Sequence, residues 1–297
     1  METNYSNPEE QAKALHGDRI NEETREIQQH LLGILKAIDQ VCREHHLRYY
    51  LFAGTMLGAM RHKGFVPWDD DADVAMPRPD YEVFLKHANE WLPERYELVS
   101  PGHPDNYPYC FARVQDGNTT YIPRRSFPFV GGLPVDVFPI DGMVGPGFRR
   151  WWHYFRYRLY WKLLYFSQTD PYKHGKGFRS VMTIAIRKIL PPLFLHRKVK
   201  EVCMEFKYEG SALLADNDNR PERGILPKEV YGEPTPIEFA GETLMTVADP
   251  DAYLRYCYGN YMEIPKVIPQ TFFRYLSLDK PWREYLKEQE EQEVRNV

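Results

Sequence analysis

Two kinds of hydrophobic pattern follow one another at the start of the chain. Residues 21–45 carry apolar side chains at three- and four-residue spacing, which predicts an amphipathic helix with Asn21 as its N-cap. Residues 47–53 form a short apolar and aromatic run, which is typical of a buried strand. This run ends in a Gly-Thr pair at 54–55.

Further helices and strands follow at irregular intervals. A helix is predicted to begin at residues 56–61, and a strand over 69–76 follows a Pro-Trp break. Pro79 is tolerated in the first turn of a helix, which we expect to continue to about Trp91. Short strands are predicted over residues 96–99, 109–115, 119–122 and 133–139.

Helices dominate the second half of the chain. They are predicted from residue 148, with breaks at Pro171 and Pro191-Pro192, and a polar, Glu-rich helix follows from Trp282. Because strands and helices do not alternate regularly, a doubly wound parallel sheet is disfavoured. We expect an α+β fold in a single domain over residues 1–297, with a mixed β-sheet core flanked by helices and a basic, aromatic helical insertion at about 148–205.

Composition excludes several classes of protein. Of the 297 residues, 43% are hydrophobic and 27% are charged, which excludes collagen-like, disordered and coiled-coil chains. The four cysteines stand singly, so neither a zinc pattern nor a disulfide framework is indicated. Because the sequence contains no secretory signal and no apolar stretch of spanning length, we expect a cytoplasmic protein.

Charge is distributed unevenly along the chain. The formal net charge is −4, yet residues 148–200 contain thirteen Lys or Arg and one acidic residue. Such a split indicates a surface that meets a polyanion or an anionic membrane. The alternative is that the charges are spread over solvated surfaces.

An apolar stripe lies within this basic segment. Its members fall at helical spacing and are Phe148, Trp152, Phe155, Leu159, Leu163 and Phe166. Flanking Arg and Lys residues make the composition that of a helix lying in a membrane interface. We therefore expect peripheral contact with the inner face of an anionic membrane, and no nucleic-acid partner. The alternative is that the stripe packs on the protein's own core.

Four aspartates at residues 69, 70, 71 and 73 form the densest cluster of charge. On an extended strand, Asp69, Asp71 and Asp73 would share one face. Carboxylates this close repel unless a cation lies among them, and their hard oxygen ligands suit Mg²⁺ or Mn²⁺. A calcium loop is excluded because its sixth and twelfth positions would be Val74 and Asp80 instead of Gly and Glu. The alternative is a solvated acidic turn.

Neighbouring residues suit phosphate chemistry. Gly54 lets backbone N–H groups approach a phosphate, and the Thr55 hydroxyl can donate to one. Arg61 and Lys63 can neutralise a transferring phosphoryl group, and His62 is a further candidate contact.

A third carboxylate is available on another predicted strand. Asp136 stands between Val135 and Val137, and a carboxylate in such a strand is costly to bury without a partner, which a metal could be. The alternative is an ordinary aspartate at the end of a strand.

Together these motifs follow the pattern of the nucleotidyltransferase fold: Gly-Thr, then Asp-x-Asp on a strand, then a lone Asp on a third strand. Residues 52–78 closely resemble the signature of the LicD-type phosphocholine transferase family, which is related to fukutin and the fukutin-related protein. Residues 133–142, and residues 258–262 with Pro265, resemble two further blocks of that family. The resemblance spans about Leu47 to Pro265.

The resemblance implies a nucleotidyltransferase-like core that transfers a phospho-alcohol, usually phosphocholine, from a CDP-linked donor. The acceptor would be a cell-surface glycan, such as lipopolysaccharide or teichoic acid, or its lipid-linked precursor. By position, Asp71 and Asp73 fill the metal pair, Asp136 is the third carboxylate, and Asp69 is a further or supporting ligand. Gly54 and Thr55 take the phosphate-loop role. Two positions depart from the family's pattern: Asn260 stands where an acid is expected, and Arg113 replaces the commoner Lys while still offering a cation for phosphate.

The implied mechanism is electrostatic. A sugar hydroxyl attacks the distal phosphorus of the donor in line and CMP departs, with Mg²⁺ (or Mn²⁺) screening the diphosphate and Asp136 accepting the proton. Arg61 and Lys63 would balance the leaving phosphate.

Aromatic residues make up 14% of the chain, which favours a quaternary ammonium ligand held by ring faces. The candidate rings are Trp68, Tyr107, Tyr109, Tyr121 and Tyr258, and the alternative for each is ordinary packing. Two other functions stay open: an NTP-dependent nucleotidyltransferase acting on a small acceptor, and a catalytically silent glycan- or membrane-binding module.

Overall fold

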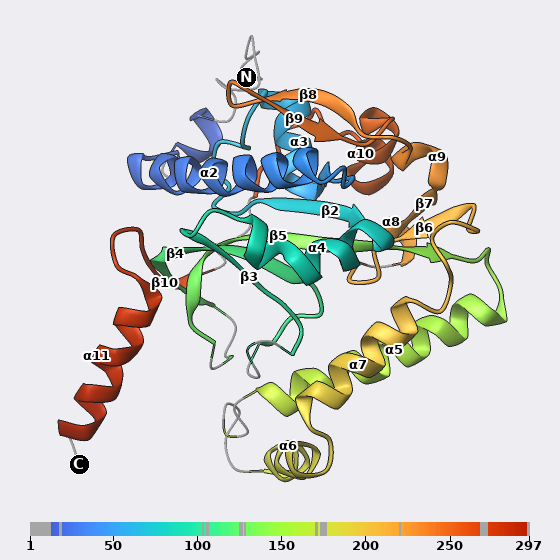
Figure 1. The fold of residues 1–297 in the computed structure, drawn as a ribbon. Helices are drawn as coiled ribbons and strands as arrows, with labels where there is room; N and C mark the ends of the chain where they lie inside the picture. The colour runs from blue at the N-terminus through green and yellow to red at the C-terminus, as the bar shows by residue number, and fades with distance from the viewer. Residues whose placement is uncertain are drawn as a thin grey trace.

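The computed structural model describes residues 13–17, 20–102, 104, 107–124, 127, 129–169, 172, 177–219, 221–267 and 273–295. A curved mixed sheet forms its centre, with helices packed around it and a group of helices extending from one end (Figure 1). Both parallel and antiparallel strand pairs occur in this sheet. The predicted α+β class is therefore confirmed.

The main sheet has the strand order β1-β2-β5-β4-β10, with β3 paired to β4, β6 paired to β5, and β7 paired to β6. Its strands are β1 (Tyr50–Leu51), β2 (Asp73–Pro77), β3 (Tyr96–Val99), β4 (Ala112–Pro123), β5 (Gly131–Met143), β6 (Leu213–Ala215), β7 (Ile225–Pro227) and β10 (Phe273–Ser277). A separate hairpin is formed by β8 (Thr235–Phe239) and β9 (Glu242–Thr246).

One parallel pair decides how the site is assembled. Strands β2 and β5 run parallel, with Asp73 opposite Asp136, and β4 lies antiparallel on the other side of β5, with Arg113 also opposite Asp136. A parallel pair needs a long crossover. The crossover here comprises α4 (Arg78–Trp91), β3 and β4.

Helix α2 (Glu22–Glu44) shows why the periodic segments were predictable. Its Asn21 N-cap accepts a hydrogen bond from the Thr24 backbone N–H at 2.8 Å, and its apolar positions, including Leu31 and Ile34, are buried against the sheet. Each such burial stabilises the fold by about 1.5–3 kcal/mol. The predicted α2 and α4 are both confirmed, as is the terminal α11 (Trp282–Arg295).

The strand predictions near the aspartates were partly wrong. Only Tyr50–Leu51 are extended in the first run, because the chain turns at Ala53, with φ +44°, directly into α3 (Ala53–His62). Residues 69–72 form a loop, and β2 begins only at Asp73. The alternation expected for Asp69, Asp71 and Asp73 on one strand face therefore does not exist.

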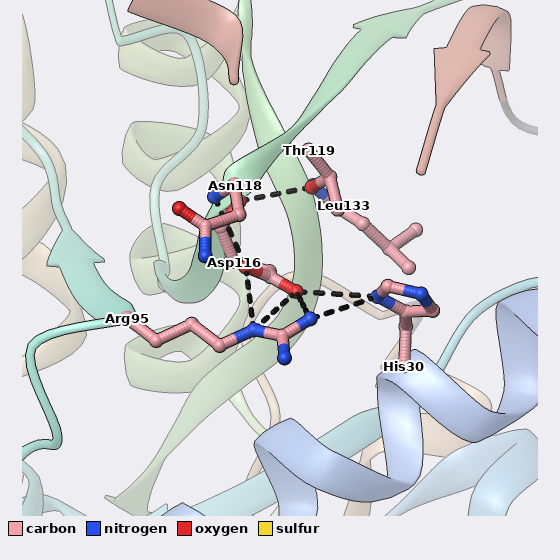
Figure 2. A network of polar contacts seen from close by, with 6 residues as sticks. All are labelled: His30, Arg95, Asp116, Asn118, Thr119 and Leu133. Atoms are coloured by element: carbon pink, nitrogen blue, oxygen red, sulfur yellow. Dashed lines mark hydrogen bonds and ion pairs between the residues drawn. The ribbon is translucent and has the colours of Figure 1, made fainter. Parts of the chain in front are cut away.

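The two strands predicted over 109–115 and 119–122 are one strand, β4, with a register irregularity between Asp116 and Tyr121. Figure 2 shows the network at this irregularity. The fully buried Asp116 carboxylate accepts hydrogen bonds from Arg95 Nη2 at 2.7 Å and from the Asn118 backbone N–H at 3.1 Å, and His30 Nδ1 lies 3.2 Å away. Burial by itself would raise the pKa of Asp116, but these hydrogen bonds outweigh it and hold the pKa below its usual value.

The basic segment folds as predicted into helices, named here the helical module: α5 (Phe148–Gln168), α6 (Phe178–Ile189) and α7 (Pro192–Cys203). Helix α5 packs against both α6 and α7, and the three lie at one end of the molecule, away from β2 and β4 (Figure 1). The break predicted at Pro171 lies outside the described residues, while α7 begins at Pro192 as expected. Among the described residues, no helix has the length and apolar character needed to cross a membrane.

Three short helices lie near the β6–β7 strands and helix α3. These are α8 (Pro221–Gly224), α9 (Lys228–Tyr231) and α10 (Pro250–Tyr258). Helix α10 contacts α3, so the C-terminal part of the chain closes over the segment that carries the Gly-Thr pair.

Candidate functional site

The start of α3 is tied directly to the first residue of β2. The Phe52 backbone N–H donates to the Asp73 carbonyl at 3.0 Å, and the Asp73 backbone N–H donates to Thr55 Oγ1 at 2.8 Å. A Cβ built on Gly54 would lie only 3.3 Å from Asp69 Oδ2, so glycine permits this close approach. The N-terminal turn of α3, a favourable environment for phosphate, therefore lies against the aspartate loop.

Asp71 and Asp73 lie in a strongly acidic surrounding. Burial is the largest cause that raises the pKa of Asp71, and the charges of Asp73, Asp69 and Asp70 raise it further. Burial likewise raises the pKa of Asp73, followed by the charge of Asp136, while Arg113 lowers it in part. These carboxylates cannot all be ionised together unless positive charge is added to the site.

Asp136 is joined to Arg113 across neighbouring strands. Arg113 Nε lies 2.6 Å from Asp136 Oδ1, and Arg113 Nη2 donates to Oδ2 at 3.1 Å. The Arg113 side chain is buried, and burial alone would lower its pKa, but Asp136 and nearby tyrosines raise the pKa well above the usual value. This arginine therefore carries its charge next to Asp73 and Asp136.

Aromatic rings surround the Arg113 guanidinium. Its central carbon lies 3.8 Å from the Tyr109 ring centroid, 5.7 Å from that of Phe111 and 5.9 Å from that of Tyr121. Tyr109 and Tyr121 were predicted to face a quaternary ammonium ligand, and here they contact the protein's own cation. Tyr107 is fully buried behind Tyr109 and donates to the Phe111 carbonyl at 2.8 Å.

Tyr258, one of the rings predicted to contact a quaternary ammonium group, lies near the aspartates and is accessible to solvent. It ends α10, and its side chain is 44% exposed. Burial around the hydroxyl, followed by the charges of Asp73, Asp69 and Asp71, raises the pKa of Tyr258.

The basic residues predicted around 61–63 are engaged by other parts of the chain. Burial lowers the pKa of Arg61, and the charge of Asp69 raises it in part. The buried Arg61 donates from Nη1 to the Tyr261 carbonyl at 2.8 Å and from Nε to His62 Nε2 at 2.8 Å. Lys63 is exposed and lies 3.2 Å from Glu238 of the β8–β9 hairpin. Burial and then the Arg61 charge lower the pKa of His62 to about 4, so His62 is neutral near pH 7.

Trp68 is also held in packing contacts. It is buried in a small cluster with Val66 and Ile264, and its ring centroid lies 4.7 Å from that of His16. Among the residues predicted for the site, the structure therefore brings together Gly54, Thr55, Asp69, Asp71, Asp73, Arg113, Asp136, Tyr109 and Tyr258. Arg61 and Trp68 contact the C-terminal part of the chain, Lys63 contacts the hairpin, and His62 contacts Arg61 and Trp68.

Sequence reasoning missed a second polar cluster on β5. Arg78, the first residue of α4, donates from Nε and Nη2 to both carboxylate oxygens of the buried Asp141 at 2.7 Å. Asn217 Nδ2 donates to the same carboxylate at 3.1 Å. Both Arg78 and Asp141 stood inside the family-like segments, but only strand pairing brings them together.

Asp216, the residue before Asn217, was missed as well. It is buried, and burial followed by the charge of Asp218 raises the pKa of Asp216 to about 7, while its charge also acts on Asp73. The polar Asp-Asn-Asp-Asn run at 216–219 was the feature of the sequence that could have identified this cluster.

The donor chemistry of the cluster fits a hard divalent cation. Asp71 and Asp73 supply carboxylate oxygens, and their mutually raised pKa values are what an added cation would relieve. Within the part of the chain that the structure describes, no three His, Cys, Asp or Glu side chains are already arranged to hold a metal. The absence of such a group is explained in part by Asp136, because its carboxylate is paired with the Arg113 guanidinium.

The sequence is similar to that of several known proteins. Residues 46–146 match the family model described as LicD/FKTN/FKRP, nucleotidyltransferase domain. The chain is 27% identical over 252 residues to the lipopolysaccharide cholinephosphotransferase LicD of Haemophilus influenzae, covering 81% of this chain and 92% of that protein. An uncharacterised protein of Rickettsia prowazekii is 32% identical over 110 residues, covering 37% of this chain and 40% of its own length. The family resemblance inferred from residues 52–78 and 133–142 is thereby confirmed.

Proposed function

From the premise that residues 46–146 form a LicD/FKTN/FKRP-type nucleotidyltransferase domain, we propose that this protein is a transferase that moves phosphocholine from CDP-choline to a glycan hydroxyl. The acceptor is a cell-surface glycan such as lipopolysaccharide, or its lipid-linked precursor at the inner face of the membrane. The similarity to a lipopolysaccharide cholinephosphotransferase over 81% of the chain supports this assignment. The observation that carries it is the meeting of Asp71, Asp73 and Asp136 with the α3 N-terminus.

The reaction that we assign is a single in-line displacement. A bond forms between the acceptor oxygen and the distal phosphorus of the donor, and the phosphorus–oxygen bond to CMP breaks. The acceptor proton passes to a carboxylate, for which Asp136 is our candidate. The first turn of α3 binds and orients the diphosphate through the Gly54 N–H and the Thr55 hydroxyl, because the Thr55 N–H already donates to the Phe52 carbonyl at 3.0 Å.

Positive charge is needed at two places in this scheme. Arg113 supplies a fixed cation beside Asp136, and its ring contacts with Tyr109 keep it there. Mg²⁺ or Mn²⁺, which Asp71, Asp73 and Asp136 would hold with support from Asp69, would neutralise the diphosphate when bound. Arg61 and Lys63 can take part only after leaving their present partners at Tyr261 and Glu238.

A donor panel tests this proposal. The full-length protein is mixed with Mg²⁺, a lipopolysaccharide acceptor and one of CDP-choline, CDP-ethanolamine, CDP-glycerol or CDP-ribitol, and release of CMP is measured together with the mass of the modified glycan. We expect CMP release with CDP-choline and loss of it in Asp71→Asn. Asp279→Asn, which changes an exposed aspartate far along the sequence, is the matched control.

Two outcomes would contradict the proposal. Transfer of CMP from CTP, with release of pyrophosphate and no use of any CDP-linked donor, would identify an NTP-dependent nucleotidyltransferase instead. Absence of donor binding by calorimetry across the whole panel, with the glycan still bound, would identify a catalytically silent module.

A further inference from the structure

Helix α5 exposes a row of aromatic side chains that the core does not cover. Phe148, Trp151, Trp152 and Phe155 are 74%, 57%, 42% and 47% exposed, and Leu159 continues the row one turn later. The Trp151 ring centroid lies 5.7 Å from that of Phe148 and 5.6 Å from that of Phe155. We call these five residues the aromatic patch. The alternative raised by the sequence, that the stripe packs on the protein's own core, does not hold for these residues.

The buried side of α5 is polar and aromatic instead. His153 and Tyr157 face the interior, where His153 Nε2 lies 2.9 Å from Asn217 Oδ1. Asn217 in turn contacts Asp141, the partner of Arg78, which directly follows β2. A chain of buried polar contacts thus fixes the orientation of α5 relative to the strand that carries Asp73.

Helix α6 and the start of α7 carry further exposed apolar side chains. Phe178, Val181 and Ile189 on α6 are all strongly exposed, and so is Leu193 at the start of α7. The rings of the aromatic patch contact one another, and soluble monomers rarely expose apolar patches of this kind, so a partner that covers the patch is indicated. Figure 1 shows α5 and α7 side by side below the sheet, with α6 beyond them.

Charge identifies the chemistry of that partner. Arg150, Trp151, Phe155, Arg158 and Lys162 line a groove of about 550 Å³ along the patch. Arg150 is engaged with the Val144 carbonyl, whereas Arg158 and Lys162 form no ion pair within the described part of the chain. Cations beside exposed tryptophan and phenylalanine match the headgroup region of an anionic bilayer, in which phosphates lie next to buried acyl chains.

We propose that the aromatic patch and its flanking cations seat this protein on an anionic lipid bilayer, with α5 lying in the headgroup region. The attachment is peripheral, because α5 alternates apolar and basic positions and does not qualify as a spanning helix. Membrane binding itself does not depend on the proposed function. The use that we assign to it, presenting a lipid-linked acceptor to Asp73 and Asp136, does rest on that function.

Vesicle flotation of the full-length protein tests the attachment. Vesicles of phosphatidylcholine with about 30% phosphatidylglycerol are compared with vesicles of phosphatidylcholine alone, at low and at high salt. We expect binding to the anionic vesicles to be about tenfold stronger, and to fall about tenfold when ionic strength rises from roughly 0.05 to 0.5 M, because salt screens the cations.

Paired variants separate the two contributions. Trp151→Ser with Phe155→Ser removes two exposed rings, and Arg158→Gln with Lys162→Gln removes two cations, so each pair should weaken binding about tenfold. The controls are Val83→Ser with Tyr256→Ser, and Lys86→Gln with Lys287→Gln, which change comparably exposed residues on other helices. Circular dichroism and thermal unfolding of every variant should match the wild type, because all of these side chains are exposed.

Three results would overturn the proposal. The first is no flotation with anionic vesicles, and the second is vesicle binding that the patch variants do not weaken. The third is a dimer, seen by light scattering, that forms through Trp151 in a protein that does not bind vesicles. The last result would assign the patch to a second copy of the chain. CMP release with a water-soluble acceptor, measured without vesicles, reports on the proposed function separately, so each proposal can fail alone.

Discussion

Strand β5 carries two buried arginine–aspartate pairs that use the same chemistry for different ends. At Asp141 the pair with Arg78 is bidentate, the carboxylate is 1% exposed, and Asn217 donates an additional hydrogen bond. At Asp136 the pair with Arg113 has a carboxylate that is 19% exposed and that faces Asp73. We name them the closed pair and the open pair.

The two pairs on this strand therefore have different roles, one in stability and one in the reaction. The closed pair joins the start of α4 to β5 and, through Asn217, to α5, and solvent hardly reaches it. The open pair leaves one carboxylate edge available among aspartates whose pKa values are raised by burial and by each other. Removing the closed pair should therefore change stability, whereas removing the open pair should change the reaction.

The largest expected effect concerns the aspartates beside the open pair. Asp71→Asn or Asp73→Asn should reduce transfer by about 100- to 1,000-fold or more, because charge stabilisation of the diphosphate is lost. Stability without metal should hold or rise, since one of several repelling carboxylates is removed. CMP release and thermal unfolding measure the two effects, and near-normal turnover in either variant would show that the metal assignment is wrong.

At the closed pair we expect the reverse. Asp141→Asn leaves the buried Arg78 with Glu82, whose Oε1 lies 3.2 Å from Nη1, as its remaining counter-ion. This loss should lower the free energy of unfolding by up to about 3–5 kcal/mol in urea titrations. Replacing both partners, as in Arg78→Met with Asp141→Leu, should recover much of that loss because no buried charge remains. If Asp141→Asn unfolds at the wild-type urea concentration, the distinction between the two pairs fails.

A third pair, Arg95–Asp116 on β4, provides a pH test far from the site (Figure 2). Because the pKa of Asp116 is lowered in the folded protein, its contribution is complete above the unfolded value of about 3.9 and is lost as pH falls through the folded value. Asp116→Asn should cost about 1.5–3 kcal/mol at pH 7, and the difference from wild type should shrink below about pH 4. Urea unfolding at pH 7, 4 and 3 measures it; a difference that grows at low pH would contradict the assignment.

The rings of Tyr109, Phe111 and Tyr121 around Arg113 make the open pair sensitive to the shape of its cation. Arg113→Lys keeps the charge but loses the planar fork that contacts Asp136 and stacks on Tyr109, and we expect kcat/KM to fall about tenfold. In Arg113→Gln, kcat/KM should fall further, because the charge is lost as well. Equal activity of the Lys and wild-type proteins would show that only the charge matters.

The smallest expected effect concerns the donor's alcohol. If Tyr258 contacts a trimethylammonium group, a donor with a neutral tert-butyl isostere should bind more weakly by about 0.5–2 kcal/mol, as measured by calorimetry. Tyr258→Leu should remove that discrimination, whereas Tyr258→Phe should keep it because the ring face remains. Equal affinity of wild type for both donors would favour ethanolamine or a polyol.

Local patterns were sufficient for most elements and for the identity of the acidic cluster. The apolar spacing of residues 27–42 predicted α2, Pro79 marked the first turn of α4, and the aromatic segment after residue 148 predicted the helices that begin at α5. Asp71, Asp73 and Asp136 were identified from their motif, and the strand pairing then placed Asp73 opposite Asp136. Helical and strand periodicity depends on neighbours within a few residues, and such neighbours can be read from a sequence.

The pairing of cations with carboxylates could be determined from the tertiary structure alone. Arg61 and Lys63 stand near the aspartates in sequence yet contact Tyr261 and Glu238, while Arg113, fifty residues beyond Lys63, pairs with Asp136. The same holds for Arg78 with Asp141, and for the aromatic patch, whose exposure depends on what α6 and α7 cover. These pairings follow from strand order and helix packing, which bring together residues that are distant in the chain, so no local pattern contained them.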